Sequence, residues 1–445
     1  MELRTIRTPG LGDNSFVLAH DGLGVLVDPQ RDVERFLAVA SELDVELRWV
    51  LETHLHNDYV SGGRDAAARS GAELVLPAGA VAPFRHTPAF HGEDLVEGSL
   101  AIRPLHTPGH TPEHTSYLVL IEGEPVAVFS GGSLLVGSAG RSDLLGADRA
   151  IELARAQHRS VHRLASLPAA VRLLPTHGEG SFCTASGAGR TTSTIGAELA
   201  SNPVLAHPDE EAFIAAQLTG LEPYPSYYAR MGPINLAGPT PMPPTGVPTL
   251  DLESFDALAD DVEVIDLRDR RAFAAGHIDG ALGIELSDEF GVWVGWVVPF
   301  DAPIALVVDE GSDVTEAVTQ LGRIGYDRVE GTIKMGQWTR AGRPVRSYRT
   351  TTVEQAGARL ARESLQVLDV RAPSEWAAGH LAGSLHRYLP DLATAPPPEL
   401  DPRRPTWTVC ASGYRSTIAA GLLERHGHPP VVLDAGGVPD LLGAR

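Results

Sequence analysis

The alternation of apolar and polar positions predicts short strands and helices in turn over roughly the first 200 residues. One helix is expected at 32–43, where Val33, Phe36, Leu37, Ala40 and Leu43 fall on a single face. A longer helix is expected at 147–164, and another near residue 64. Apolar, β-branched runs predict strands at 15–19, 25–28, 47–53, 118–121, 126–129 and 171–175. This order predicts an α/β domain.

The composition changes between about 200 and 248, where proline, glycine, tyrosine and serine become frequent, as in 222–228 and 238–246. Proline-rich chain is extended and semi-rigid, which suits a connector between domains. We therefore expect a first domain over 1–235, including a C-terminal extension, and a linker over 236–248.

The remainder contains an internal repeat, in which the segment beginning at Val264 recurs at Leu368. A period of about 100 residues indicates a duplicated domain rather than a solenoid, whose units are about 20 to 50 residues long. Two similar α/β domains are expected, over 249–345 and 350–445. The matching pairs are Asp266 and Asp369, Arg268 and Arg371, His277 and His380, and Gly280 and Gly383.

Composition narrows the classes of function. The chain has 445 residues, 43% of them hydrophobic and 21% charged, which is typical of a soluble globular protein with about three domains. Its net charge of -21 argues against nucleic acid or an anionic membrane as a partner. No apolar run approaches the ~20 residues of a membrane span, so we expect a cytoplasmic protein. The sequence is also compatible with a homo-oligomer.

Two histidines and an aspartate alternate directly after the strand at 47–53, as His54, His56 and Asp58. Neutral imidazole binds zinc and iron, and a carboxylate can bind metal, orient a histidine or take a proton. His110 follows a Pro-Gly turn, and His177 follows the strand at 171–175. Side chains at strand ends can meet at one sheet edge, so a metal site is expected there.

These strand-end histidines resemble the metallo-β-lactamase superfamily, over about residues 1–200, and within it persulfide dioxygenases and glyoxalase II. Thr-His-Leu-His-Asn-Asp at 53–58 resembles their first metal motif, and Thr-Pro-Gly-His-Thr at 107–111 the second. Residues 129–135 and 140–143 resemble a third. The resemblance implies a four-layer αββα sandwich with the metal along one edge of the sheets.

The chain departs from this family at two positions. The resemblance implies an aspartate ligand where Gly132 stands and a histidine where Tyr59 stands. A persulfide dioxygenase would hold one Fe(II) with His54, His110 and that aspartate. With both departures, the second metal of a binuclear site, as in glyoxalase II, would lose two ligands.

The remaining candidate ligands for one Fe(II) or Zn(II) are His54, His56 and His110. Asp58 and His177 would lie beside these ligands or face the substrate. The loss of a charged ligand lowers metal affinity, so a weakly bound metal and a metal-free pocket are both retained as alternatives.

A second candidate site is Cys410, which stands at the end of a predicted apolar strand. Its loop consists of Ala411, Ser412, Gly413 and Tyr414, followed by Arg415, Ser416 and a helix. Backbone N–H groups of such a loop, the helix N-terminus and Arg415 form a cradle for anions. The same field favours a thiolate nucleophile.

This loop resembles that of rhodanese sulfurtransferases, over about residues 350–445. The resemblance implies that Cys410 carries a sulfane sulfur, that the loop and Arg415 hold a donor such as thiosulfate, and that a low-molecular-weight thiol or cyanide accepts the sulfur. Asp369, Arg371 and Glu375 are expected to be structural hydrogen-bonding partners. In the middle repeat Asp309 stands in place of Cys410, so that domain is expected to be inactive.

The order of domains resembles bacterial fusions of a persulfide dioxygenase with rhodanese domains in sulfide metabolism. Small-molecule persulfides, such as that of glutathione, are then the expected substrates. Gly132 lacks the carboxylate expected for dioxygenation, so the stronger catalytic prediction is sulfur transfer at Cys410. A zinc-dependent thioester hydrolase with a rhodanese passenger, and a non-catalytic N-terminal scaffold, are the alternatives. Cys183 is either a sulfur relay or a packed core residue, and packing is favoured.

Overall fold

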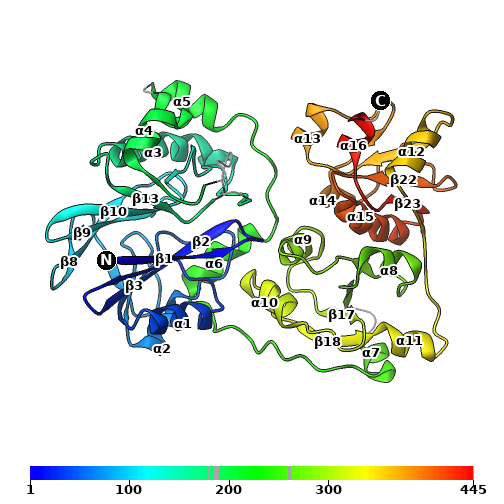
Figure 1. Ribbon diagram of the computed structural model, residues 1–445, viewed down its shortest axis with the longest axis horizontal. Coiled ribbons are helices and arrows are strands. Elements are labelled where there is room, and N and C mark those ends of the chain that lie inside the picture. The colour runs from blue at the N-terminus through cyan, green and yellow to red at the C-terminus, as the bar shows by residue number, and fades with distance from the viewer. Residues whose placement is uncertain (179, 184–189, 208, 259–261, 444–445) are drawn as a thin grey trace. The chain divides into compact units, whose positions relative to one another are not determined.

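The computed structural model describes residues 1–178, 180–183, 190–207, 209–258 and 262–443 (Figure 1). The chain forms two compact units. The first consists of Met1–Pro243 with Gly322–Gly325, and the second of Pro244–Leu321 with Tyr326–Arg445.

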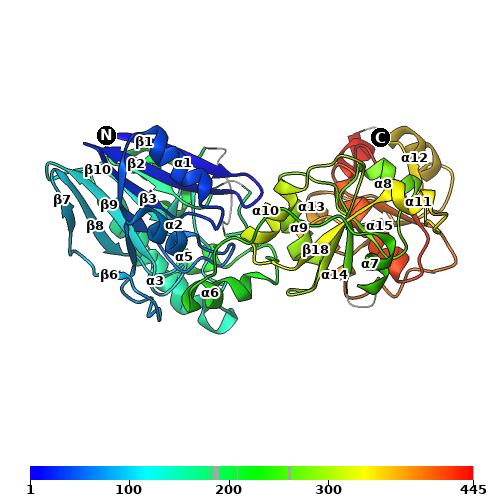
Figure 2. The ribbon, with the colours of Figure 1, turned by 90° about the horizontal axis from the view of Figure 1, so that it is seen from below.

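The first unit contains two six-stranded sheets whose inner faces share one apolar core (Figure 2). Phe16 and Phe129, one from each sheet, have ring centroids 5.4 Å apart in this core. The first sheet has the order β1 (Glu2–Thr8), β2 (Asp13–His20), β3 (Leu23–Val27), β4 (Glu46–Leu51), β5 (Glu73–Pro77) and β6 (Thr87–Ala89). The second has the order β14 (Ser193–Thr194), β13 (Arg172–Pro175), β10 (Glu124–Gly131), β9 (Thr115–Ile121), β8 (Leu100–His106) and β7 (Leu95–Glu97).

Helices cover the outer faces of both sheets. Helices α1 (Glu34–Glu42) and α2 (Gly63–Ser70) bury Phe36 and Ala66 against the first sheet. Helix α3 (Ala147–Ala165) buries Val161 and Leu164 against the second. The expected αββα sandwich is therefore confirmed. A hairpin of β11 (Leu134–Leu135) and β12 (Ser138–Ala139) adjoins the second sheet.

The segment from about 200 to 237, whose composition suits a connector, is largely helical. It contains α4 (Ile195–Ser201), a 3₁₀ turn (Pro203–Ala206), α5 (Glu210–Gln217) and α6 (Tyr228–Ala237). Phe213 and Met231 are each at most 1% exposed. A composition rich in proline therefore does not prevent buried helices in this segment, most of which lies within the first domain expected over 1–235. Residues 238–248 contain neither helix nor strand.

The second unit contains two parallel sheets with the same order of corresponding strands. One has the order β16 (Leu282–Gly283), β15 (Glu263–Asp266), β17 (Ile304–Val308) and β18 (Val329–Lys334). The other has the order β21 (Leu385–His386), β20 (Gln366–Asp369), β22 (Thr406–Val409), β23 (Pro430–Leu433) and β19 (Arg349–Thr351). We call these the four-stranded and five-stranded halves. The repeat in sequence is thus a repeat of fold.

Helices in the two halves also correspond. In the four-stranded half they are α7 (Leu252–Ala257), α8 (Arg270–Ala275), α9 (Phe290–Val297), α10 (Thr315–Arg323) and α11 (Met335–Arg340). In the five-stranded half they are α12 (Val353–Leu360), α13 (Pro373–Ala378), α14 (Leu389–Leu392), α15 (Tyr414–Arg425) and α16 (Val438–Gly443). None of the helices in the described ranges has the length and apolarity required to cross a bilayer.

Candidate metal centre and cysteine loop

Three histidines meet at one edge of the two sheets in the first unit. His54 lies just beyond β4, His110 lies in the loop between β8 and β9, and His177 lies just beyond β13. All three are at most 1% exposed. Strands far apart in sequence therefore deliver three imidazoles to one buried point.

The ring nitrogens of these three residues are close enough to bind one ion. One nitrogen from each of His54, His110 and His177 lies within 4.8 Å of the other two. The Nε2 atoms of His54 and His177 are 3.3 Å apart. Two nitrogens bound tetrahedrally to one ion at ~2.05 Å would be about 3.3 Å apart. The spacing fits a metal between them.

Hydrogen bonds on the other ring nitrogen fix the tautomers of His54 and His110. His110 Nδ1 donates to the carbonyl of Arg141 at 2.7 Å. His54 Nδ1 faces Thr53 Oγ1 at 2.9 Å, and Thr53 already donates its only hydroxyl hydrogen to Asp28 at 2.7 Å. Thr53 must therefore accept from His54. In both rings Nε2 is left with a lone pair.

His177 follows the same rule, because its Nδ1 donates to a carboxylate oxygen of Asp13 at 2.8 Å. The Nε2 lone pairs of His54 and His177 then face each other and cannot form a hydrogen bond. Among the described residues, Nε2 of His110 has no hydrogen-bond partner although it is buried. Unsatisfied buried acceptors are costly, so this donor set fits a bound Zn(II) or Fe(II).

The pKa values of these rings also favour the form that binds metal. Burial lowers the pKa of His54 and His110 well below the usual value, and neighbouring histidines lower each further. Burial likewise lowers the pKa of His177. The three rings are held neutral, as ligation requires.

His56, which sequence reasoning grouped with His54 and His110, has different neighbours. Its Nε2 lies 3.2 Å from carboxylate oxygens of both Asp28 and Glu52. Burial opposes protonation of His56, but these carboxylates raise its pKa well above the usual value. The charge of His56 in turn outweighs burial and lowers the pKa of Asp28. The pair Asp28 and His56 is therefore ionic, and His177 is the third imidazole beside His54 and His110.

Asp58 lies next to His177, where sequence reasoning expected it. Its Oδ2 is 3.4 Å from Nδ1 of His177, and the two residues form a further group with His56 whose ligand atoms lie within 4.8 Å. Burial raises the pKa of Asp58 to about 7, helped by the charge of Asp13. Burial raises the pKa of Asp13 to about 7 as well. The two carboxyls can hold a proton beside the metal ligands.

Gly132 leaves no room for the aspartate that the family resemblance implies. A Cβ atom there would lie 2.2 Å from Cδ2 of His110. Tyr59, at the other departure from the family motif, is buried, stacks on His56 with ring centroids 4.3 Å apart and donates to the carbonyl of Asp28 at 3.2 Å. The lost ligand positions are occupied by packed rings.

Sequence reasoning missed Asp13, Asp28 and Glu52. Asp28 and Glu52 directly follow β3 and β4, and Asp13 begins β2, so the strand-end rule that found the histidines applies to at least two of them. Asp28 adopts φ +50°, a conformation that aspartate tolerates better than most residues. Such a conformation at a strand end can mark a site residue.

In the second unit, Cys410 lies at a tight turn from strand to helix. It directly follows β22, is 1% exposed, and accepts a hydrogen bond at Sγ from the N–H of Gly413 at 3.1 Å. Gly413 has φ +93°, and a Cβ there would lie 2.5 Å from the carbonyl oxygen of Asp434. Helix α15 begins at Tyr414. The turn places the sulfur at the helix N-terminus, where negative charge is stabilised.

Arg415 does not stand free in the loop. Its Nη2 donates to Oε1 of Glu375 at 2.8 Å, and Nη1 bonds to the second oxygen. The pKa of Glu375 is lowered although burial opposes this, mainly because of Arg415. Arg371 forms a two-bond pair with Asp369 and donates to the carbonyl of Gly379. Glu375 therefore orients Arg415. From the sequence, Glu375 is expected to be a structural hydrogen-bonding partner, but Arg415 is not named there as the residue it holds.

The other residues of the cysteine loop differ in their hydrogen-bond partners. Ser416 is buried, and within the described chain its Oγ has no hydrogen-bond partner. Tyr414 donates its hydroxyl to the carbonyl of Glu285 at 2.8 Å. The carbonyl of Ser412 accepts from Arg270, and that of Ala411 lies against Gly437.

The corresponding turn of the four-stranded half carries Asp309, exposed, directly after β17. Its neighbour Glu310 pairs with Lys334 at 2.9 Å and Arg340 at 3.0 Å. Carboxylates occupy this turn, and residues 309–314 include no cysteine or arginine.

Cys183 is fully buried, and burial raises its pKa well above the usual value. Such a thiol stays protonated and packs as a small hydrophobe. The residues that follow it, 184–189, lie outside the described residues.

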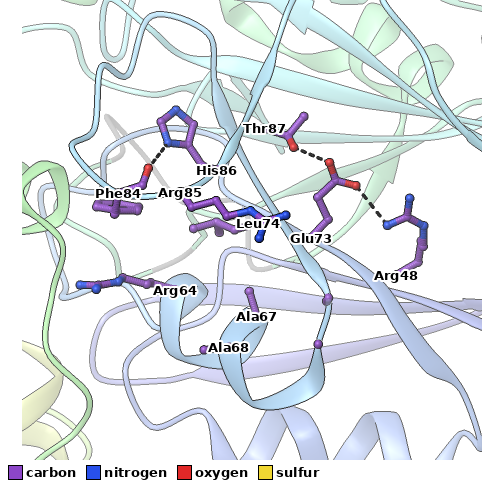
Figure 3. A pocket seen from close by; sticks show the side chains of 12 residues that line it. Arg48, Arg64, Ala67, Ala68, Glu73, Leu74, Phe84, Arg85, His86 and Thr87 are labelled. Atoms are coloured by element: carbon purple, nitrogen blue, oxygen red, sulfur yellow. Dashed lines mark hydrogen bonds and ion pairs between the residues drawn. The ribbon is translucent and has the colours of Figure 1, made fainter.

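A cavity of about 700 Å³ lies between α2, β5 and the segment before β6 (Figure 3). Arg48, Arg64, Arg85 and His86 line it, with Glu73 as its one acidic residue. Glu73 pairs with Arg48 at 3.1 Å, whereas no ion pair within the described residues engages Arg64 or Arg85. A smaller cavity that reaches His54 shares the residues Arg64, Leu74 and Phe84 with it.

Comparisons with known proteins find relatives of both the first unit and the five-stranded half of the second unit. The metallo-beta-lactamase superfamily model matches residues 8–177, and the rhodanese-like domain model matches residues 352–443. A hydroxyacylglutathione hydrolase of Acidiphilium cryptum (strain JF-5) is 34% identical over 175 residues, 38% of this chain and 67% of that protein. A Burkholderia pseudomallei (strain 1710b) protein named "Probable metallo-hydrolase" is 31% identical over 170 residues, 32% of this chain and 56% of its own length.

One solved structure extends the similarity past the first unit. The metallo-beta-lactamase from Staphylococcus aureus subsp. aureus COL is 29% identical with a TM-score of 0.69. The match covers 75% of this chain and 99% of that one.

Replacing His177 by alanine should remove most bound metal, because one of three converging lone pairs is lost. We expect zinc and iron per chain, measured by mass spectrometry after mild dialysis, to fall at least tenfold. His162→Ala, a half-buried histidine of α3, is the control and should retain the metal. If His177→Ala retained metal and His56→Ala lost it, the ligand set expected from sequence would be the correct one.

Gly132→Asp should lower metal content although it adds a carboxylate. The Cβ alone would collide with the ring of His110, so this ligand must move. Metal content and affinity against a chelator are the measurements. Gly246→Asp, at an exposed glycine with open space around it, controls for the added charge. A gain in affinity in Gly132→Asp would contradict the packing argument.

Proposed function

Because the chain belongs to the metallo-β-lactamase superfamily over its first unit and carries a C-terminal rhodanese-like domain, we propose that it is an enzyme of persulfide metabolism. In this proposal Cys410 transfers sulfane sulfur, and the metal centre acts on a small persulfide. The observation that carries the proposal is the turn of Cys410, whose sulfur receives an N–H hydrogen bond at a helix N-terminus.

The sulfur transfer needs only the groups of this turn and its two substrates. The Cys410 thiolate attacks the outer sulfur of thiosulfate, the S–S bond breaks, and sulfite leaves with the electron pair. A thiol or cyanide then attacks the outer sulfur of the Cys410 persulfide, which returns the Cys410 thiolate. The N–H of Gly413 and the helix N-terminus stabilise the sulfur anion in both steps. Arg415, oriented by Glu375, faces the anionic donor.

The first unit would oxidise the persulfide. One persulfide, one O₂ and one water give one thiol, sulfite and two protons. A ferrous ion held by His54, His110 and His177 would supply the O₂ chemistry when bound. The carboxyls of Asp13 and Asp58 can take up and return a proton at Oδ2 of Asp58, beside His177. The sulfite can accept sulfur from Cys410 and leave as thiosulfate.

A zinc-dependent thioester hydrolase is the second candidate. Three neutral imidazoles without a charged ligand are a set that zinc uses in catalytic sites, where a water fills the fourth position. The relative from Acidiphilium cryptum, itself named a hydroxyacylglutathione hydrolase, supports this candidate. A non-catalytic first unit remains the third alternative and requires little or no metal.

We also propose that the basic cavity of Figure 3 receives the acidic groups of the thiol carrier. Arg85 extends into the cavity without an acidic partner among the described residues, and the adjoining small cavity reaches His54. A carrier with carboxylates, such as glutathione, fits this charge.

The two activities should separate by mutation. Cys410→Ser should abolish thiosulfate:cyanide sulfur transfer and leave O₂ uptake with glutathione persulfide unchanged, whereas His54→Ala should do the reverse. Metal analysis accompanies both assays. Zinc with thioester hydrolysis and no O₂ uptake would favour the hydrolase. Substoichiometric metal, with His54→Ala without effect, would favour the scaffold. Sulfur transfer that survives Cys410→Ser would overturn the proposal.

Arg85→Glu should raise the KM of the first unit for the persulfide of glutathione at least fivefold. Opposite charges about 4 Å apart attract by ~1 kcal/mol or more, so reversing one costs about this much affinity. The control is Arg7→Glu, which makes the same charge change at an exposed position in β1. An unchanged KM in Arg85→Glu would exclude the cavity as the carrier site.

A further inference from the structure

The four-stranded half of the second unit contacts the cysteine loop directly. Helix α8 begins with Arg270, whose Nη1 donates to the carbonyl of Ser412 at 3.2 Å. Its Nε donates to Glu285 at 2.8 Å. The guanidinium also lies over the ring of Tyr414, 5.7 Å from its centroid. One arginine thus touches two residues of the loop.

The carbonyl that accepts the hydrogen bond from Arg270 belongs to the same peptide unit whose N–H donates to Cys410. The C=O of Ser412 and the N–H of Gly413 are parts of one planar peptide unit, and in a trans peptide they point in opposite directions. The N–H side donates to Sγ of Cys410 at 3.1 Å, while the C=O side accepts from Arg270. Arg270 therefore fixes the orientation of this peptide. A cation at the carbonyl also polarises the N–H and strengthens it as a donor.

A second arginine supports the surface on which the loop rests. Arg271 donates to Oδ2 of Asp434 at 2.9 Å. The backbone of Asp434 packs against Gly413 so closely that a Cβ there would lie 2.5 Å from the Asp434 carbonyl oxygen. Both arginines of the α8 start thus act on the same turn.

The two repeats do not share these arginines. The helix α13 of the five-stranded half starts at the matching position with Pro373 and Ser374, where α8 has Arg270 and Arg271. Cations in the first turn of a helix are unfavourable to the helix dipole. Their presence is explained by the contacts they make outside their own helix.

We propose that the four-stranded half, which lacks a cysteine of its own, positions the cysteine loop of the five-stranded half through Arg270. Arg270 is a positioning residue in this proposal, because it acts on Cys410 through the peptide between Ser412 and Gly413. The proposal rests on the proposed sulfur transfer for its role in catalysis. Among the described residues, the ion pairs that adjoin the cysteine loop are Arg415 with Glu375, Arg270 with Glu285, and Arg271 with Asp434. Asp440 also lies near the loop, because its Oδ2 accepts from the N–H of Gly437, which packs against the carbonyls of Cys410 and Ala411.

The same two halves offer a matched control at the far end of α15. There Arg425 donates to the carbonyl of Gly280 at 2.8 Å and pairs with Glu263 at 2.8 Å. The residues from Tyr414 to Arg425 span about 16 Å of helix at ~1.5 Å per residue. Arg425→Gln therefore weakens contact between the halves without touching the loop.

The test compares Arg270→Gln, Arg270→Lys and Arg425→Gln in the full chain. We expect Arg270→Gln to lower kcat/KM for thiosulfate:cyanide transfer about tenfold, and the pH midpoint of Cys410 alkylation by iodoacetamide to rise. Alkylation is followed on the Cys410 peptide by mass spectrometry. Arg270→Lys, which keeps the charge, should restore part of both. Arg425→Gln should match the unmodified protein in both, and thermal melting shows whether each variant is folded.

The possible failures are distinguishable. An unchanged alkylation profile and rate in folded Arg270→Gln, with transfer abolished in Cys410→Ser, would overturn the positioning role and leave sulfur transfer intact. Equal loss in Arg270→Gln and Arg425→Gln would also overturn it, because general contact between the halves would then explain the effect. If transfer survived Cys410→Ser, the proposed function would fail, and the alkylation midpoint would still decide whether Arg270 positions the peptide.

Discussion

Three imidazole lone pairs converge in the buried interior, and the first unit is organised around holding them there. His54, His110 and His177 cannot hydrogen-bond one another through these atoms, so the arrangement must be fixed from behind. Asp28 does much of this work. It accepts from the N–H and hydroxyl of Thr53 and from the hydroxyl of Thr176. One carboxylate thus joins the ends of β3, β4 and β13 across both sheets, directly behind the histidines.

The departures from the family motif form one coherent change. The ring of His110 lies where a side chain at position 132 would be, so the carboxylate is absent and the ring packs on the glycine backbone. The ring of Tyr59 stacks on His56, and His56 lies between Asp28 and Glu52 as the positive member of an ion pair. Asp28 and Glu52 place negative charge beside His56 and neutralise it. His54, His110 and His177, the candidate metal ligands, are neutral.

Strand ends were predictable from sequence, but side-chain directions were not. Apolar runs located half of the twelve strands of the sandwich, namely β2, β3, β4, β9, β10 and β13. His54, His177 and Cys410 stood out because they follow such runs closely. The sequence repeat, in which matching residues are 103 positions apart, predicted the duplicated fold of the second unit. The pairing of His56 with Asp28 and Glu52 depends on rotamers and on residues 28 and 4 positions away, which no spacing rule indicates. Likewise, the helices between 195 and 237 form because a few apolar residues are buried by tertiary contacts, against their proline-rich composition.

The proposed substrates, namely persulfide, thiosulfate and sulfite, all carry negative charge on sulfur or oxygen. The two sites would stabilise such anions in different ways. The first unit presents lone pairs, which are suited to holding a cation that attracts such an anion. The second unit presents hydrogen-bond donors, and a peptide N–H can serve this purpose only if the peptide cannot rotate. A peptide unit is fixed when both of its polar ends are engaged. At Cys410 the sulfur engages one end, and a cation from the neighbouring repeat engages the other. In this proposal, the repeat that carries Asp309 in place of a cysteine serves as structural support for the repeat that carries Cys410.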